Sequence, residues 1–277
     1  MSDRLRHLWD FSDLDATRER LDGQLTRETD DAGRAEVITQ FARIEGLRND
    51  FAAASRRLAE AEGLAGSSAV ARARIDLERG RALRSSGEPA AAFPLFVSAY
   101  ELALGSGNDF IAADAVHMAA LVDPLGAERW SARGIDLAGR SAAAAYWLGP
   151  IYNNLGWARL EAADAAGAHD AFEKALAARE RRPDRQEEIA IAHYAVARSL
   201  RELGRPSDAA AEAERAVSWA ETNGTPDGWF YEELAEDYAA LGRDEDARRM
   251  ARLAIPLLEA ADPSFDGDRA AQLAELR

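Results

Sequence analysis

The sequence repeats itself roughly every 35 to 41 residues, and this internal similarity limits the fold more than any single motif does. In one unit, Leu155 and Gly156 are followed by Ala163, Ala168 and Phe172. The pair that corresponds to Leu155 and Gly156 recurs in four other segments, as Phe41 and Ala42, Arg79 and Gly80, Val196 and Ala197, and Leu234 and Ala235. Because repeated units of this length pack mainly on their neighbours, the pattern predicts an array of similar structural units.

Each unit is expected to be helical. Alanine, the best helix former, occurs in runs such as 52–54 and 142–145, whereas β-branched residues are sparse and scattered. Clusters of turn residues at 86–89, 203–206 and 241–244 separate the amphipathic segments. We therefore predict an all-α chain in which each unit is a helix-turn-helix.

Two positions of the unit explain how its helices pack. The eighth position carries a small residue such as Gly80, which lets the first helix (helix A) lie against the second (helix B). The fifteenth position carries Asn49, Gly87 or Gly204, residues that adopt the positive φ of a tight turn. This arrangement resembles the tetratricopeptide repeat family. The resemblance implies a right-handed α-α superhelix with about six repeats.

The repeats are expected to start near residues 35, 73, 108, 149, 190 and 228 of a single domain that covers 1–277. A capping helix is expected within 1–34, with Ser12 and Asp13 at its start, and a second cap within 262–277. The runs 114–118, 152–157 and 231–234 are similar to those of bacterial stand-alone tetratricopeptide proteins. That resemblance implies a fold and partner binding but no chemistry.

In this family the second, fifth, ninth and twelfth positions of helix A face a concave groove, since these offsets lie on one helical stripe. The candidate partner-binding residues on or beside this stripe are Arg43, Arg74, Arg81, Arg84, Asn153, Asn154, Trp157, Tyr194, Arg198, Arg201, Glu232 and Glu236. Arginine grips carboxylates through two parallel hydrogen bonds. The stripe therefore suggests a groove for an acidic peptide or a C-terminal carboxylate.

The same residues allow a purely structural interpretation. Arg81 can pair with Glu78 or with another carboxylate across the groove, and Glu232 and Glu236 can balance Arg198 and Arg201. An asparagine in the groove can also fasten two helices, and Trp157 can serve packing alone. The sequence leaves both interpretations open.

Composition and charge restrict the remaining function classes. The chain has no cysteine, which excludes disulfides and thiolate chemistry, and its net charge of −15 opposes binding to nucleic acid or anionic membranes. The uncharged segment 141–156 is too short and too polar for a bilayer, and no apolar leader is visible at the start, so we expect a cytoplasmic protein. The four histidines lack metal-ligand spacing, and phosphate-binding loops are absent, so no metal or cofactor is expected.

One pair of residues, Asp114 and His117, is a candidate for acid-base catalysis. Asp114 and His117 share one helical face, as a carboxylate and a general base would, but no nucleophile accompanies them. His169, beside Asp170, is expected to be solvated. We therefore predict that the protein is not an enzyme.

The preferred hypothesis is a protein-protein interaction module that binds a peptide or a partner protein in its groove. The alternatives are a regulatory protein that senses a ligand or peptide, or a homo-oligomeric scaffold, possible as a homodimer. The first 34 residues are too short for a DNA-binding head, which disfavours the regulator. Exposed aromatic residues near the ends, at Trp9, Phe11 and Phe265, would mark the contact edge of a scaffold.

Overall fold

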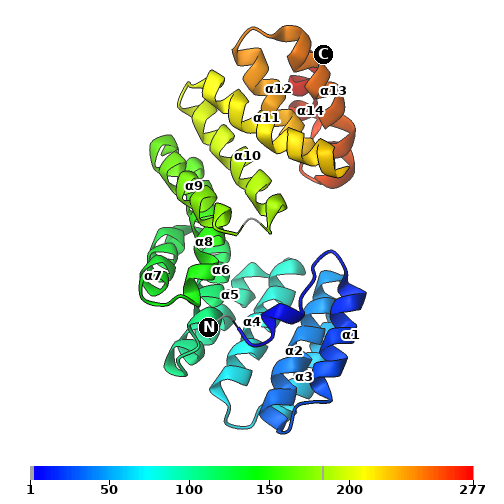
Figure 1. Cartoon of the computed structure of the whole chain (residues 1–277), viewed down its shortest axis with the longest axis vertical. Helices are drawn as coiled ribbons and strands as arrows, with labels where there is room; N and C mark the ends of the chain where they lie inside the picture. Colours follow the sequence, from blue (N-terminus) through cyan, green and yellow to red (C-terminus); the bar gives the residue numbers. More distant parts are fainter. Residues whose placement is uncertain (1–2, 183, 277) are drawn as a thin grey trace. The chain divides into compact units, whose positions relative to one another are not determined.

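The computed structural model describes residues 3–182 and 184–276 (Figure 1). These residues form α-helices and short 3-10 helices without any strand, so the prediction of an all-α chain of helical hairpins is confirmed. The chain divides in sequence between Asn154 and Leu155 into two compact units. We call residues 3–154 the first unit and the described residues from 155 onward the second unit.

The first unit contains, in order, η1 (Arg6–Leu8), α1 (Leu14–Leu25), α2 (Asp31–Leu47), α3 (Phe51–Ala65), α4 (Ala69–Ser85), α5 (Pro89–Gly105), α6 (Asp109–Val122), η2 (Pro124–Gly126), α7 (Ala127–Arg140), η3 (Ala144–Trp147) and the start of α8 (Leu148–Glu161). Helices α2 and α3, α4 and α5, and α6 and α7 pack as successive hairpins. In addition α2 packs on α4, and α4 packs on α6, so the A helices of successive hairpins are neighbours.

The second unit contains the end of α8, then α9 (Ala165–Glu180), α10 (Gln186–Glu202), α11 (Pro206–Asn223), α12 (Gly228–Ala240), α13 (Asp244–Ala261) and α14 (Gly267–Glu275). Here α10 pairs with α11 and α12 with α13, while α10 also contacts α12. The short α14 packs on α13, and its Leu273 is 3% exposed in the core of this unit.

The helices begin and end where local sequence signals predict. Asp13 caps α1 by accepting a hydrogen bond from the backbone N–H of Ala16. The segment Asp123–Pro124 ends α6, because proline removes a donor and restricts the residue before it. Asn49 follows α2 with a φ of 60°, as expected for the turn position. Ala163 occupies the equivalent turn with a φ of 59°, a left-handed conformation that is strained for a residue with a Cβ atom.

The close approach of helices A and B depends on one small residue in each hairpin. A Cβ atom placed on Gly80 of α4 would lie 2.5 Å from Cε1 of Phe96 on α5, whose ring is fully buried. In the second unit, a Cβ atom on Gly156 would lie 2.3 Å from Cε1 of Phe172. Glycine at the eighth position therefore makes room for a phenylalanine ring from helix B.

Where the eighth position is alanine, helix B carries a residue smaller than phenylalanine at the same offset along the chain, which is leucine for Ala42 and alanine in the second unit. Ala197 is matched by Ala213, and Ala235 by Ala251, all of them at most 1% exposed. The combined volume of each facing pair is thus kept small, as a close-packed interior requires. This pairing sets the spacing of the hairpins and so places the A helices of each unit beside one another.

Gly80→Ala is expected to lower the free energy of unfolding by about 1–3 kcal/mol, because the added methyl group meets the ring of Phe96. The double variant Gly80→Ala/Phe96→Leu should recover part of this loss. Chemical denaturation followed by helical circular dichroism measures both.

The control is Gly63→Ala on α3, where an added Cβ atom meets nothing within 4 Å. This change should stabilise the helix by about 0.5–1 kcal/mol. Equal effects of the two glycine substitutions would contradict the packing explanation.

Candidate functional site: the inner face of the first unit

We call the side of α2, α4 and α6 that carries Arg43, Arg74, Arg81, Asp114 and His117 the inner face of the first unit. On α4, Arg74, Glu78 and Arg81 are spaced four and three residues apart, which places their side chains on one helical stripe. The packing of α2 on α4 and of α4 on α6 brings the stripes of the three helices together.

Arginines of this face pair with carboxylates of the next helix A. Arg43 on α2 lies 3.4 Å from Glu78 on α4. Arg81 on α4 pairs with Asp114 on α6, and it also pairs with Glu78 of its own helix. Glu78 and Asp114 are 5% and 4% exposed, so these ion pairs are largely withdrawn from water. The structure therefore contains the intramolecular ion pairs that the sequence allowed for Arg81. The guanidinium groups expected to receive a ligand already hold carboxylates of the chain.

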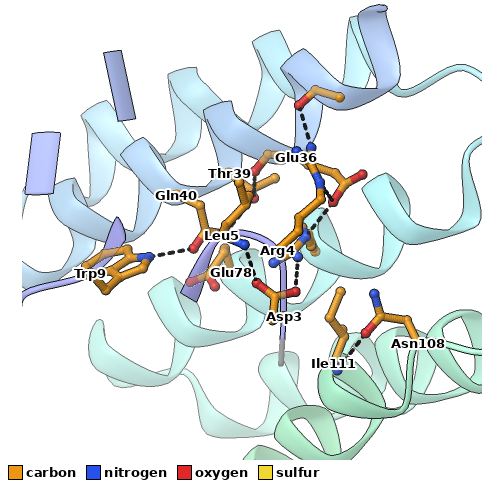
Figure 2. Close-up of polar contacts among 12 residues, drawn as sticks. Asp3, Arg4, Leu5, Trp9, Glu36, Thr39, Gln40, Glu78, Asn108 and Ile111 are labelled. Atoms are coloured by element: carbon orange, nitrogen blue, oxygen red, sulfur yellow. Dashed lines mark hydrogen bonds and ion pairs between the residues drawn. The ribbon is translucent and has the colours of Figure 1, made fainter. Parts of the chain in front are cut away.

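The segment before α1 covers another part of this face (Figure 2). The carboxylate of Asp3 accepts a hydrogen bond from the backbone N–H of Leu5 at 3.0 Å and pairs with Arg74, whose Nε lies 3.0 Å from Glu36. Trp9 donates from Nε1 to Gln40 at 2.9 Å. Arg74 is thus enclosed between two carboxylates and is 5% exposed.

Residues outside the arginine stripe also contribute to the face. Asn154 on α8 donates from Nδ2 to the backbone oxygen of His117, over 3.5 Å. Trp147 of η3 stacks on the His117 ring with centroids 5.5 Å apart.

Arg84 near the end of α4 is exposed and forms neither an ion pair nor a hydrogen bond with the described part of the chain.

Several buried polar atoms of this face have no hydrogen-bond partner within the described residues. They come from α2, α4, α6, η3 and α8 and are Arg43 Nε, Glu78 Oε2, His117 Nδ1, Trp147 Nε1 and Asn153 Oδ1. Buried polar groups in native proteins nearly always have partners, and each unsatisfied group costs about 1–3 kcal/mol. These atoms therefore have hydrogen-bonding capacity that no group in the described part of the chain uses.

His117 does not form a catalytic pair with Asp114. The carboxylate of Asp114 is engaged by Arg81, and Nδ1 of His117 is among the atoms without a partner. Burial lowers the pKa of His117 to about 4, against the favourable charge of Asp114 and with the help of nearby arginines. The imidazole is therefore neutral near pH 7, and a neutral ring offers one donor and one acceptor. His169, expected to be solvated, instead lies 3.1 Å from the hydroxyl of Ser199.

The second unit brings its predicted residues into a separate cluster of charges. Arg198 lies 3.4 Å from Glu233 and 3.3 Å from Glu236, and Arg201 donates from Nε to Glu233 at 2.7 Å. Glu232 instead accepts from Nε of Arg269 on α14, at 2.7 Å. The arginines and acids on this side of α10 and α12 thus pair with one another, as one of the sequence interpretations anticipated for Glu236.

Aromatic residues of the second unit serve packing within it. Trp157 contacts the rings of Phe172 and Tyr194, with centroids 5.2 and 5.9 Å apart. Phe265, considered as a contact edge, packs against the core and under the guanidinium of Arg269. Trp9 of the first unit is likewise held by Gln40, whereas Phe11 is 43% exposed.

The candidate set derived from the sequence omitted several acids of these clusters, although Glu78 was considered as a partner of Arg81 and Glu232 and Glu236 were included. The residues absent from the candidate set are Asp3, Glu78, Asp114, Glu233 and Asp237, all of them buried. A usable signal existed, because Arg43 and Arg198 each have an acid at the sixth position of the following repeat, at Glu78 and Glu233.

Comparison with known proteins fixes the fold. No protein-family model and no curated protein matches the sequence. A tetratricopeptide repeat protein from Parabacteroides merdae is similar in structure, with a TM-score of 0.54, 14% identity and coverage of 99% of this chain and 95% of that one. The fold is that of the tetratricopeptide-repeat proteins.

Two further solved structures share this tetratricopeptide fold. The apo form of RapI has a TM-score of 0.68 at 12% identity, over 94% of this chain and 75% of that one. The apo form of the quorum sensor NprR from B. thuringiensis has a TM-score of 0.56 at 14% identity, over 92% and 85% of the two chains. Identities this low show a shared fold and leave the ligand to be argued from the residues.

The described residues hold no cluster of three or more potential metal ligands. Among the described helices, none combines the length and the apolar character that crossing a bilayer requires.

Arg81→Gln is expected to lower the free energy of unfolding by about 3–5 kcal/mol, because it leaves the buried carboxylates of Glu78 and Asp114 without their partner. Arg81→Gln/Asp114→Asn should recover part of that loss. Arg56→Gln, an exposed arginine on α3, serves as the control and should change stability by less than about 0.5 kcal/mol. A loss with Arg81→Gln no larger than the control's would contradict the bracing role.

The stability of the second unit is expected to fall as pH rises from 6 to 9. Burial and the neighbouring Glu233 raise the pKa of Asp237 to about 8 against the pull of Arg201, and burial raises the pKa of Glu233 to about 7. Because the folded state holds these protons more tightly than the unfolded chain does, their stabilising effect is lost as pH passes through 7–8.

Asp237 is 0% exposed, neither of its oxygens has a hydrogen-bond partner in the described residues, and Oδ1 lies 3.8 Å from Nε of Arg201. Asp237→Asn should therefore raise the melting temperature at pH 9 and flatten its pH dependence. Thermal melts at pH 6, 7, 8 and 9 measure this, with the exposed Glu259→Gln as the control. An unchanged slope in the Asp237 variant would sink the assignment.

Proposed function

We propose that the protein is a non-catalytic binding module that holds an extended peptide segment of a partner protein on the inner face of the first unit. The observation that carries the proposal is the set of five unpartnered buried polar atoms contributed by α2, α4, α6, η3 and α8, which we call the row. A tetratricopeptide fold supports this interpretation, since its repeats build extended binding surfaces.

The chemistry of the row matches a peptide backbone. Arg43 Nε and Trp147 Nε1 are donors, Glu78 Oε2 and Asn153 Oδ1 are acceptors, and the neutral ring of His117 can be either. An extended peptide presents one N–H and one C=O group per residue, which uses donors and acceptors together. A simple anion or cation would use only one of the two kinds.

The paired arginines support the site rather than grip the ligand. Arg43, Arg74 and Arg81 hold Glu78, Asp3, Glu36 and Asp114, so the face carries compensating charges. Ion pairs of this kind hold the side chains of the site in place before a ligand arrives, which lowers the entropy cost of binding. In this proposal, acidic groups of the partner are received by arginines with free donors, of which Arg84 is the clearest.

Other classes of partner fit less well. The net charge of −15 opposes nucleic acid and anionic membranes. Catalysis is left out of the proposal because His117 is held neutral and apart from Asp114, so it lacks the activated base that acid-base chemistry needs.

A ligand-sensing regulator is the second candidate. The structural likeness to the quorum sensor NprR favours it, although at 14% identity that likeness concerns the fold. In such a protein the inner face would hold a free peptide, and binding would change a surface that another protein contacts. Both candidates share the same peptide site and differ in whether the ligand belongs to a larger partner.

Peptides selected from a random display library on the full chain should bind with micromolar dissociation constants, since a few net hydrogen bonds remain after association costs. Asn153→Ala is expected to weaken these peptides about threefold to tenfold, because it removes an acceptor from the row. Its melting temperature should not fall, because no hydrogen bond within the chain is lost at Asn153 Oδ1. Isothermal titration and thermal melts measure the two effects.

Asn223→Ala on α11 is the matched control and should leave peptide affinity unchanged. If the selected peptides bind the Asn153 variant as tightly as the unmodified chain, the inner face of the first unit is not their site.

A further inference from the structure

The segment 3–11, which we call the strap, lies against the inner face of the first unit (Figure 2). Its only regular structure is the single 3-10 turn η1, in which the backbone N–H of Leu8 donates to the backbone oxygen of Leu5 at 3.1 Å. A helix this short is not stable in water by itself. The position of the strap therefore depends on its contacts with the helices behind it.

Polar side chains hold the first part of the strap. Asp3 pairs with Arg74 on α4. Arg6 donates from Nε to the hydroxyl of Tyr146 in η3, at 2.9 Å. Asp3 is buried and Arg6 is half-buried, so both contacts are at least partly withdrawn from water. The strap is thus tied both to α4 and to the residue that precedes Trp147.

Aromatic side chains hold the last part of the strap. The rings of Trp9 and Phe11 stack on each other with centroids 4.9 Å apart. The guanidinium of Arg43 on α2 lies 5.4 Å from the centroid of Trp9 and 5.5 Å from that of Phe11. Arg43 supplies one atom of the row, so the strap contacts the face at the place where the proposed peptide would bind.

Two leucines anchor the middle of the strap in the core. Leu5 is 1% exposed and Leu8 is 7% exposed, and both pack with Leu21, Val37 and Phe41. These contacts exclude water and do not depend on the polar ends of the strap. The polar ends can therefore leave the inner face while the leucines keep the first hairpin covered.

Opening of the strap leaves no buried charge alone. When Asp3 leaves, Arg74 keeps its second carboxylate, because its Nε lies 3.0 Å from Glu36. The costly case of a buried ion without any partner is thus avoided. Asp3 and Arg6 both gain water in exchange for the contacts that they lose.

The strap is an incomplete occupant of the face. While it is in place, Glu78 Oε2, His117 Nδ1 and Asn153 Oδ1 still lack a partner in the described residues. A segment that also met these atoms would bind the face better than the strap does. Because the strap is joined directly to α1, it is always present at high effective concentration, and any peptide must compete with it.

We propose that the strap is an autoinhibitory segment of this protein. In the free chain Asp3, Arg6 and Trp9 close the inner face, and a partner's peptide displaces these three side chains while Leu5 and Leu8 stay in the core. The strap thereby lowers the affinity of every peptide for the face by the fraction of molecules in which it is open. The proposal rests on the proposed function and adds the regulation of access to the same face.

The first test uses the unmodified full chain and library-selected peptides whose binding depends on Asn153. The reporter is the backbone amide of Leu5, whose N–H donates to the carboxylate of Asp3 at 3.0 Å. Amide hydrogen exchange followed by NMR should show this amide exchanging at least threefold faster with saturating peptide, because Asp3 has left. The amides of α12 in the second unit serve as the internal control and should not change.

The second test weakens the polar ends of the strap and spares its leucines. Asp3→Asn/Arg6→Gln should raise the affinity of the same peptides about threefold to tenfold in isothermal titration, because the face is open more often. The matched control is Asp22→Asn/Arg27→Gln, which makes the same changes at exposed positions outside the strap and should leave affinity unchanged.

Unchanged or slower exchange at Leu5 with peptide bound would overturn the autoinhibitory role, and so would equal affinities of the strap variant and its control. If the peptides still depend on Asn153 in either case, the proposed function stands and only the regulation fails. Selection is carried out on the unmodified chain and on the strap variant. Failure to obtain Asn153-dependent peptides with either chain would remove the proposed function and the role of the strap together.

Discussion

The candidate site depends on the ion pairs that the buried carboxylate of Glu78 forms with two arginines. One of its oxygens holds both Arg43 of α2 and Arg81 of α4, and Arg81 in turn reaches Asp114 of α6. Removing one partner from such a group leaves a buried charge uncompensated, which is far more costly than losing a surface ion pair. These ion pairs therefore fix α2, α4 and α6 relative to one another and determine which polar atoms have no hydrogen-bond partner.

The fold could be predicted from the sequence because its determinants are local. Gly80 and Gly156 indicate positions where the rings of Phe96 and Phe172 pack closely, and Asn49 indicates a turn with positive φ. Such signals act within one hairpin and repeat along the chain, so each occurrence supports the others. Ala163 is the exception, since a residue that does not favour positive φ occupies the same turn.

The site could be predicted only in part, because it depends on contacts between repeats. The stripe containing Arg43, Arg81 and Arg198 follows from helical periodicity, but its carboxylate partners lie on the next helix A. Which atoms remain unpaired depends on distances of a few tenths of an ångström. Periodicity could not identify Glu78 Oε2 as unpartnered, nor Asp3 as the residue that encloses Arg74. The arginines Arg43, Arg81 and Arg198 thus already have carboxylate partners within the chain.

A crystal structure of the chain with a selected peptide bound would test the central claim most directly. The account predicts that the pairs of Arg81 with Glu78 and Asp114 stay intact, and that the peptide contacts the unpartnered atoms of Glu78 and Asn153 and the guanidinium of Arg84. A peptide whose acidic groups displace Glu78 or Asp114 from the arginines would contradict it. In that case the arginine stripe itself would be the binding site, and the intramolecular ion pairs would be the state that the ligand replaces.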